Sequence, residues 1–314
     1  MSIQKSLRLS LVLMACLPLI FLTIFTYNLS YKKYMDLATQ STVELAKNYG
    51  MGFQSQLNSQ IAEVEGLANG TNIQNLVLEN YNGVTLGNDS PYYTNVTDLF
   101  ATASDYAGNN VNYYLYDVNG YYITSSDNTN TDDWQEHMAI PVEDITETKI
   151  LQCSPLDEIE SIDVVSPIII KSQIVGLIRA NITSRYFGSF IPEDGSAFIM
   201  TNDGGYLFTS TGLTGQRELE TQAFNCLNGA DNAKDYGHLK ASSFKNIYGF
   251  CKLSDSNWLY LIKQQGTQYQ QILATLPITM SITLIIILMI AIWVSRILSA
   301  KYTEPIFTLR DNMT

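Results

Sequence analysis

Two short stretches, YLYDVNGYYITSS (Tyr114–Ser126) and FIMTNDGGYLFTS (Phe198–Ser210), decide the fold of this 314-residue chain. Each consists of an apolar strand, an Asn-Gly or Asp-Gly turn, and a second strand that closes on serine. Those dipeptides favour the positive φ angles that a tight β-hairpin requires. The sequence therefore predicts two β-hairpins of the same layout.

The hairpins belong to an internal repeat. Tyr114 aligns with Phe198, and 198 − 114 gives an offset of 84 residues. The same offset pairs QIVGLIRAN (Gln173–Asn181) with NWLYLIKQQ (Asn257–Gln265), which both resemble buried strands. Because both ends of the repeat keep one spacing, two similar sheets in tandem explain the pattern better than chance. SRYFGSFI (Ser184–Ile191) predicts a short helix between them.

A long helix is predicted before the repeat, over residues 31–68. Apolar side chains recur there at steps of three and four, which places them on one face of a helix. They are Phe53, Leu57, Ile61, Val64 and Leu67. The polar stretch NGTN (Asn69–Asn72) is expected to end or loosen the helix.

Two uncharged apolar runs, Ser10–Tyr27 and Ile272–Val294, flank this region. At ~1.5 Å rise per residue, each can cross a hydrocarbon core of roughly 30 Å. A cleaved signal peptide and a lipoprotein signal at Cys16 are the alternatives for the first run. However, its apolar core is long, no small-residue cleavage site follows it, and the residues after Cys16 stay apolar. We therefore expect two retained spans.

The distribution of charge supports this topology in part. Residues 28–271 hold 13 Lys/Arg and 28 Asp/Glu (13 − 28 = −15), and the two flanks hold 5 against 2 (5 − 2 = +3). Basic flanks favour cytoplasmic ends, with residues 28–271 outside the cell. Lys32 and Lys33, on the outer side of the first span, run against that tendency. The negative middle segment argues against nucleic acid as a partner.

These features together resemble a double Cache sensor domain, over roughly residues 30–265. The resemblance implies an α+β fold with a long N-terminal helix and two tandem PAS-like (Cache) antiparallel sheets with flanking helices, between two transmembrane helices. The expected parts are a cytoplasmic N-terminus (1–9), a first transmembrane helix (10–27), a stalk helix (28–71), a membrane-distal Cache subdomain (72–190), a membrane-proximal one (191–266), a second transmembrane helix (272–294) and a coupling helix (295–314).

The tail EPIFTLRDNM resembles the first helix of a HAMP linker. Pro305 suits a helix start, and Ile306, Leu309 and Met313 step by three and four like a coiled-coil seam. In such families the output module is a histidine kinase, a chemotaxis signalling domain or a diguanylate cyclase. We expect that module to lie outside this sequence, which would make the chain a fragment or a trimmed gene product.

The resemblance also implies a small-molecule pocket in the membrane-distal sheet. Family members that bind amino acids carry an Arg-x-Trp-Tyr motif for the ligand carboxylate and a later Asp for its ammonium group. This sequence departs at both places, because DDWQ has Asp132 where Arg would stand and RANI has Asn181 in place of Asp. An α-amino acid bound in the usual way is therefore not expected.

Asp132 and Asp133 beside Trp134 could instead favour a cationic ligand, through carboxylate pairing and a cation–π contact. The alternative is a solvated acidic loop with one packed tryptophan. Tyr114, Tyr116 and Tyr122 could line the same pocket, although tyrosine-rich strands more often pack a core. We keep these residues, with Asn181, as the candidate ligand-binding set.

Enzyme chemistry finds little support in the sequence. His137 and His238 are the only histidines, and neither has metal-ligand spacing to another His or Cys. We assign no catalytic residue, metal site or cofactor. Cys226 and Cys251 could form a disulfide, and free buried thiols are the equal alternative.

The sequence therefore predicts the sensing region of a two-span receptor in the bacterial cell membrane. Its expected partners are a small extracellular ligand of unknown identity, membrane lipid and a second copy in a parallel homodimer. A ligand-blind extracellular interaction or dimerisation module is the alternative function.

Overall fold

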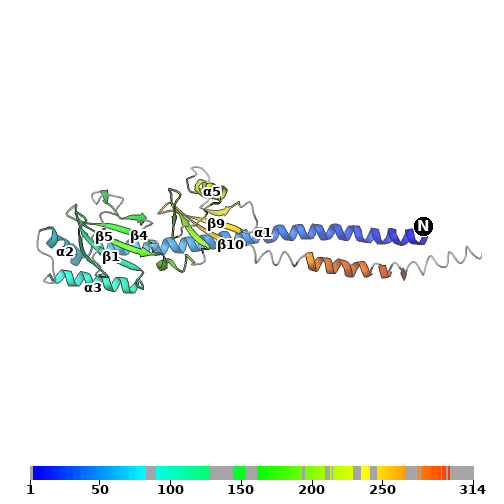
Figure 1. The fold of residues 1–314 in the computed structure, drawn as a ribbon, viewed down its shortest axis with the longest axis horizontal. Helices are drawn as coiled ribbons and strands as arrows, with labels where there is room; N and C mark the ends of the chain where they lie inside the picture. Colours follow the sequence, from blue (N-terminus) through cyan, green and yellow to red (C-terminus); the bar gives the residue numbers. More distant parts are fainter. Residues whose placement is uncertain are drawn as a thin grey trace, which may run out of the picture. The chain divides into compact units, whose positions relative to one another are not determined.

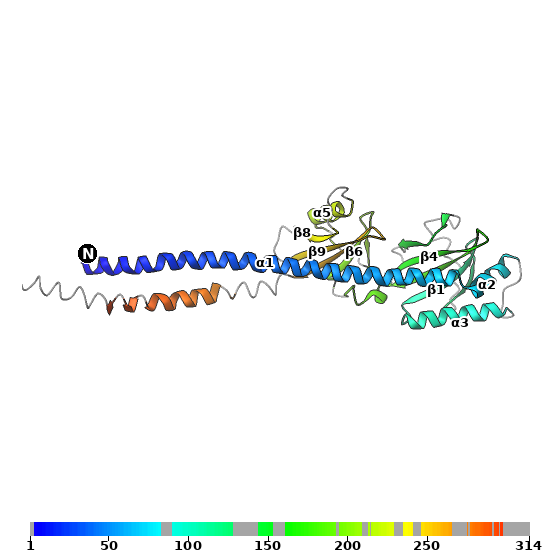
Figure 2. The same ribbon diagram turned by 180° about the vertical axis from the view of Figure 1, so that it is seen from behind.

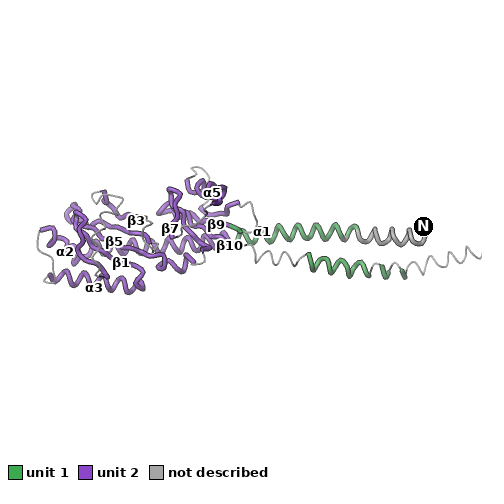
Figure 3. Tube along the Cα trace, in the orientation of Figure 1, with its two compact units in different colours: residues 1–41, 243–247, 265–314 green, residues 42–242, 248–264 purple. Residues whose placement is uncertain are grey.

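The structure is a computed structural model that forms two compact units (Figure 3). One unit comprises residues 1–41, 243–247 and 265–314, and the other comprises residues 42–242 and 248–264. The residues that the structure describes are 3–82, 90–127, 144–152, 161–192, 195–208, 213, 215–228, 235–240, 246–265, 275, 277–290, 292–294 and 296–297.

The first unit contains a helical segment that is long and apolar enough to cross a membrane, Pro277–Val294. None of this segment is buried inside the protein. Its large side chains are exposed, including Ile285, Met289 and Trp293. This finding rests on length and composition alone. The segment overlaps the second predicted span, residues 272–294.

Helix α1 extends over Ile3–Ala68 (Figure 1). The predicted stalk helix is thus continuous in the structure with the first apolar run, and Pro18 is accommodated inside the helix. The predicted end is confirmed, because α2 (Thr71–Tyr81) begins after Gly70. The apolar stripe is confirmed as well: Phe53, Leu57 and Val64 are fully buried, while Ile61 and Leu67 pack against the same core.

The second unit contains two antiparallel five-stranded sheets of equal strand order. Sheet A has the order β2-β1-β5-β4-β3 and sheet B the order β7-β6-β10-β9-β8. Their strands are β1 (Val111–Asp117), β2 (Tyr122–Ser125), β3 (Lys149–Gln152), β4 (Ser161–Ile170), β5 (Gln173–Thr183), β6 (Ala197–Met200), β7 (Tyr206–Leu207), β8 (Tyr236–Leu239), β9 (Asn246–Leu253) and β10 (Trp258–Gln265). The predicted fold class is thereby confirmed.

Helices cover the sheets within this unit. The second half of α1 passes along both sheets, and α2 and α3 (Pro91–Tyr106) pack beside sheet A (Figure 2). Helix α5 (Arg217–Asn228) covers the other face of sheet B through Leu219, Ala223 and Leu227. The predicted short helix between the sheets is present as the 3-10 helix η2 (Ser184–Phe187).

The two hairpin turns are closed by equivalent hydrogen bonds. In sheet A, the Asp117 N–H donates to the Tyr121 carbonyl (2.9 Å); in sheet B, the Thr201 N–H donates to the Gly205 carbonyl (2.9 Å). Gly120 has φ +82° and its counterpart Gly204 has φ +87°. Three residues lie between the bonded residues in each turn, and only the glycine of each Asn-Gly or Asp-Gly pair has a positive φ, so each turn is longer than the two-residue turn that the dipeptides favour.

The repeat differs between the sheets in one strand pairing. Tyr114 faces Arg179 across β1 and β5, so an offset of 84 residues would place Phe198 opposite Lys263. Phe198 instead faces Leu261, two residues away. Because side chains alternate with period two, this shift leaves every residue on its original face of the sheet.

Glycines bring α1 close to sheet B. A Cβ atom on Gly249 of β9 would lie 2.5 Å from the Thr42 carbonyl oxygen of α1. A Cβ atom on Gly50 of α1 would lie 3.0 Å from Cys251 Cβ. At Gly249 the missing side chain lets the strand approach the backbone of α1, and at Gly50 it lets the helix approach the Cys251 side chain.

The possible Cys226–Cys251 disulfide is not formed, which is a correction to that alternative. Both thiols are free, with Cys226 on α5 half-buried and Cys251 on β9 buried. Cys251 belongs to the core on the α1 side of sheet B, whereas Cys226 packs against the cluster on the α5 side that contains Tyr248 and Phe250. The sheet therefore separates the two sulfur atoms.

Candidate functional site

The candidate site lies on the face of sheet A that is turned away from the helices. Along β1 the side chains alternate: Val111, Tyr113 and Leu115 join the helix-side core, while Tyr114 and Tyr116 join a second buried cluster. The other members of that cluster are Ile145, Val165 and Leu177, with Tyr122 and Leu151 packed against them.

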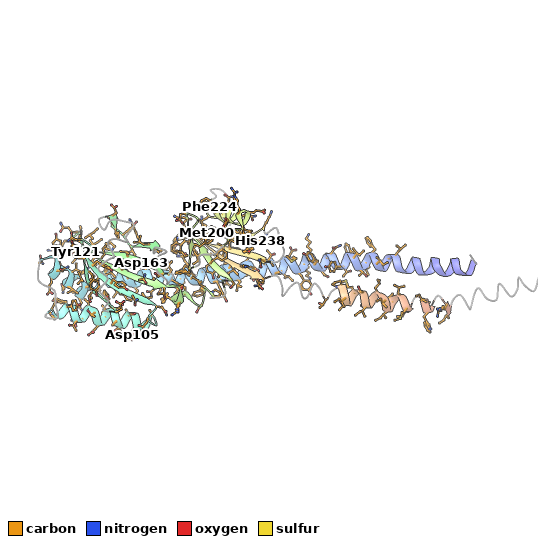
Figure 4. The ribbon with its side chains drawn as sticks, viewed as in Figure 1. Asp105, Tyr121, Asp163, Met200, Phe224 and His238 are labelled. Atoms are coloured by element: carbon orange, nitrogen blue, oxygen red, sulfur yellow. The ribbon has the colours of Figure 1, made fainter. Side chains whose placement is uncertain are left out.

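A buried ion pair stands in the middle of this face. Arg179 Nε on β5 lies 2.9 Å from Asp163 Oδ2 on β4, and the two side chains are only 13% and 8% exposed. Asn181 Nδ2 donates to Asp163 Oδ1 (2.8 Å), so both carboxylate oxygens are engaged. Asp163, which Figure 4 labels, pairs with Asn181 directly across the two strands.

Tyrosines surround the guanidinium group. The Arg179 Cζ atom lies 5.2 Å from the ring centroid of Tyr114, within range of a cation–π contact. The Tyr114 and Tyr116 rings are stacked with centroids 6.5 Å apart, and Tyr122 meets Tyr116 edge-on at 6.3 Å. The cation is thus held between a carboxylate and an aromatic wall.

A chain of hydroxyl groups extends from this wall to Asp127. Tyr114 donates from its hydroxyl group to Asp127 Oδ2 (3.4 Å), and Ser125 donates to Asp127 Oδ1 (2.8 Å). The Tyr122 hydroxyl group in turn lies 2.8 Å from Ser125 Oγ. The hydroxyl groups of Tyr114, Tyr122 and Ser125 therefore share one hydrogen-bond network with the Asp127 carboxylate at the end of β2.

Burial and charge both act on the acidities of these groups. Burial is the main cause that raises the pKa of Tyr114, and the Asp127 carboxylate raises it further. The pKa of Tyr122 is raised too, again mainly by burial. Burial would lower the pKa of Arg179, but the Asp163 charge and hydrogen bond outweigh it and raise that pKa. Arg179 is therefore a permanent cation.

The structure brings together four of the predicted ligand-binding residues: Tyr114, Tyr116, Tyr122 and Asn181. Asp132, Asp133 and Trp134 lie outside the described residues, as do the coupling residues Pro305, Ile306, Leu309 and Met313. Neither group is therefore placed relative to this face.

Sequence reasoning missed Arg179, Asp163 and Asp127. A signal was present, because RAN and SIDVV each set one charged residue inside an otherwise apolar strand. A charge in a buried strand needs a partner, and the two strands are neighbours in sheet A. Among the described residues, no group of three or more His, Cys, Asp or Glu side chains could hold a metal ion.

Comparison with solved structures identifies the same fold in extracellular sensor domains. The extracellular domain of soHK1S-Z6, assigned as a histidine kinase, matches with a TM-score of 0.54 at 9% identity, over 76% of this chain and 98% of that one. The corresponding domain of vpHK1S-Z8 matches with a TM-score of 0.52 at 10% identity, over the same shares of the two chains. No protein-family model and no curated protein matches the sequence.

Proposed function

We propose that this chain is the sensing region of a transmembrane receptor. It binds a small extracellular molecule on the face of sheet A that carries Tyr114, Tyr116 and the Arg179–Asp163 pair. The Arg179–Asp163 pair is the observation that carries the proposal. Replacing a buried ion pair with apolar residues is often neutral or stabilising, so fold stability alone does not explain the pair. Buried charged groups whose pKa is shifted, as that of Arg179 is, are instead frequent at functional sites.

The fold supports the same proposal. Its solved neighbours soHK1S-Z6 and vpHK1S-Z8 are extracellular domains assigned to histidine kinases. In the proposed arrangement, residues 10–27 and 272–294 span the bacterial cell membrane, 1–9 and 295–314 are cytoplasmic, and 28–271 are outside. Residues 72–190 form the membrane-distal subdomain and 191–266 the membrane-proximal one. This chain contributes sensing and no catalysis of its own.

Signal transfer would follow from contacts between α1 and β10. The Thr42 hydroxyl group donates to Gln264 Oε1 (2.6 Å), which ties the helix to the last strand before the second span. A ligand can shift this assembly only if it binds two conformations with different affinity. The change would then pass to the HAMP-like helix with Pro305, Ile306, Leu309 and Met313, within a parallel homodimer.

A thermal-shift screen tests the proposal. The chain of 314 residues, in lipid nanodiscs, is melted with amino acids, polyamines, quaternary amines, organic acids and purines. A hit is then repeated with Tyr122→Phe, which removes a hydroxyl group of the site network. Tyr206→Phe is the matched control, because Tyr206 occupies the equivalent place in sheet B (122 + 84 = 206).

We expect a ligand whose stabilisation falls in Tyr122→Phe and is unchanged in Tyr206→Phe. A cationic hit would support the sequence-based hypothesis of a cationic ligand at Asp132, Asp133 and Trp134. An equal loss in both variants would place the binding site elsewhere.

A ligand-blind interaction module is the second candidate function. One observation favours it: Tyr114 and Tyr116 are 7% and 0% exposed and pack against one another. If every compound leaves a cooperative melt unshifted, this second function replaces the first.

A further inference from the structure

The proposed sensing function does not use two adjacent lysines of α1, Lys32 and Lys33. Both side chains are exposed. They follow the first apolar run on its outer side, where the positive-inside tendency predicts few basic residues. Within the described ranges, neither lysine belongs to an ion pair.

The helix places these lysines at a definite height above the apolar run. Lys32 is five residues beyond Tyr27 (32 − 27 = 5), which at ~1.5 Å rise per residue is about 7 Å along the axis. The headgroup layer of a bilayer is roughly 5–8 Å thick on each side of the hydrocarbon core. If Ser10–Tyr27 fills the core, the two ammonium groups reach the headgroup layer.

The same turns of α1 have two chemically different faces. Tyr27, Tyr31 and Tyr34 recur at steps of four and three, so they form one stripe, and the first two rings lie 6.4 Å apart. At about 100° per residue, Lys32 and Lys33 fall on the opposite side of the helix. The tyrosines are half-buried and the lysines are exposed. Tyr and Lys are the residue types that settle at membrane interfaces.

Charge indicates the chemistry of the partner. The first acidic residue of the chain is Asp36, so the helix carries only positive charge up to and including Lys33. Beyond that point the proposed outer segment is strongly negative, because residues 34–271 hold 11 Lys/Arg and 28 Asp/Glu, a net charge of −17 (11 − 28). Such a segment is repelled by an anionic membrane surface, and screening confines any compensating attraction to roughly 8 Å at physiological salt. Along α1, Lys32 and Lys33 are the basic residues nearest the apolar run on its outer side, and the next one is Lys47.

We infer that Lys32 and Lys33 form a binding site for the phosphate headgroup of an anionic phospholipid in the outer leaflet. The inference rests on the proposed membrane topology and not on ligand sensing in sheet A. The site fixes the depth of α1 in the bilayer and anchors the negatively charged outer segment at the membrane surface.

The test is lipid selectivity of the full chain. The protein is reconstituted in nanodiscs of POPC that contain a minority of POPG, released, and its retained lipids are counted by native mass spectrometry. We expect POPG to be enriched over its bulk share, and Lys32→Gln/Lys33→Gln to bind it roughly tenfold more weakly. Lys171→Gln/Lys240→Gln is the control, because both residues are exposed and the net charge changes equally.

Three outcomes of this lipid experiment would overturn the inference. Wild-type POPG enrichment in the Lys32→Gln/Lys33→Gln variant would show that the lysines do not bind the headgroup. An equal loss in the control would show that only total charge matters. Competition by inorganic phosphate as strong as by POPG would indicate a free-anion site.

A protease-protection assay in spheroplasts separates this inference from the proposed topology. Cleavage within residues 28–271 from outside, together with loss of POPG in the variant, supports both. Protection of that segment with the same POPG loss would contradict the topology and move the lipid contact to the inner leaflet, which overturns the outer-leaflet assignment.

Discussion

Arg179 and Asp163 are charged side chains in strands whose neighbours are almost all apolar and buried. Each would be costly to bury alone, and their attraction and the Asn181 hydrogen bond offset that cost. Removing one partner should therefore lower the stability of the fold more than removing both.

Asp163→Asn should destabilise the protein by about 3 kcal/mol, because it leaves a buried guanidinium group without its carboxylate. Chemical denaturation of the full chain in detergent measures the change. Asp163→Asn/Arg179→Met should recover part of the loss, since no charge is then buried. A loss below about 1 kcal/mol in the single variant would contradict the importance of the pair.

The buried tyrosines predict a stability limit at alkaline pH. Burial raises the pKa of Tyr113, Tyr114 and Tyr260 above the ordinary value of 10.0. Their contribution to stability is therefore complete below pH 10 and is lost as the pH rises through the higher folded-state values.

Phenolate absorbance and circular dichroism, followed together during an alkaline titration, should show that some tyrosines ionise only as the fold is lost. Tyr114→Phe should reduce that late amplitude by one residue. Complete and reversible tyrosine ionisation near pH 10 with an intact fold would contradict this expectation.

Some residues of the candidate site can be chosen from the sequence. Tyr114, Tyr116 and Tyr122 can be placed from the sequence because the hairpin fixes their strands, whereas Asn181 was chosen because the family resemblance implies an Asp at its position. The Arg179–Asp163 contact depends on β4 lying beside β5 in register, which one strand alone does not specify.

At the scale of elements, the repeat and the long helix are predictable because their patterns extend over many residues. Helices α2 and α3 were not singled out, although SP (Ser90–Pro91) is a strong helix start: the Ser90 hydroxyl oxygen accepts from the Tyr92 N–H. The tightest hairpin was also missed. It joins β4 to β5 through Lys171 and Ser172, which both have positive φ without a glycine.

Substitution of two glycines should have opposite effects. Gly249→Ala should cost roughly 1–3 kcal/mol, because the new methyl group would meet the α1 backbone at Thr42. Gly66→Ala in α1 meets no atom within 4 Å, and alanine favours the helix by up to about 1 kcal/mol. Thermal melts of both variants check this expectation. Destabilisation by Gly66→Ala would contradict the open space around Gly66 in the structure.

At the scale of the whole molecule, one hydrophobic core serves both sheets within the second unit. A single cluster joins Phe53 and Leu57 of α1 to Val164 and Ile182 of sheet A and to Ile199 of sheet B. Because neither sheet has that core to itself, we expect them to unfold together.

Ile199→Ala tests this shared core. The fully buried side chain should cost about 2–4 kcal/mol when truncated. Hydrogen exchange should then rise in β1 and β5 of sheet A as well as in β6 and β10. Loosening confined to sheet B would show that the sheets unfold independently.

The glycine contacts between α1 and β9 have a mechanical consequence. A contact made through side chains can absorb a small movement by a change of rotamer. Backbone atoms cannot adjust in this way. Where Gly249 lies against the Thr42 carbonyl group, no side chain stands between strand and helix, so a movement of the strand toward α1 displaces the helix as well. We therefore expect this junction to pass a small movement of β9 directly to α1.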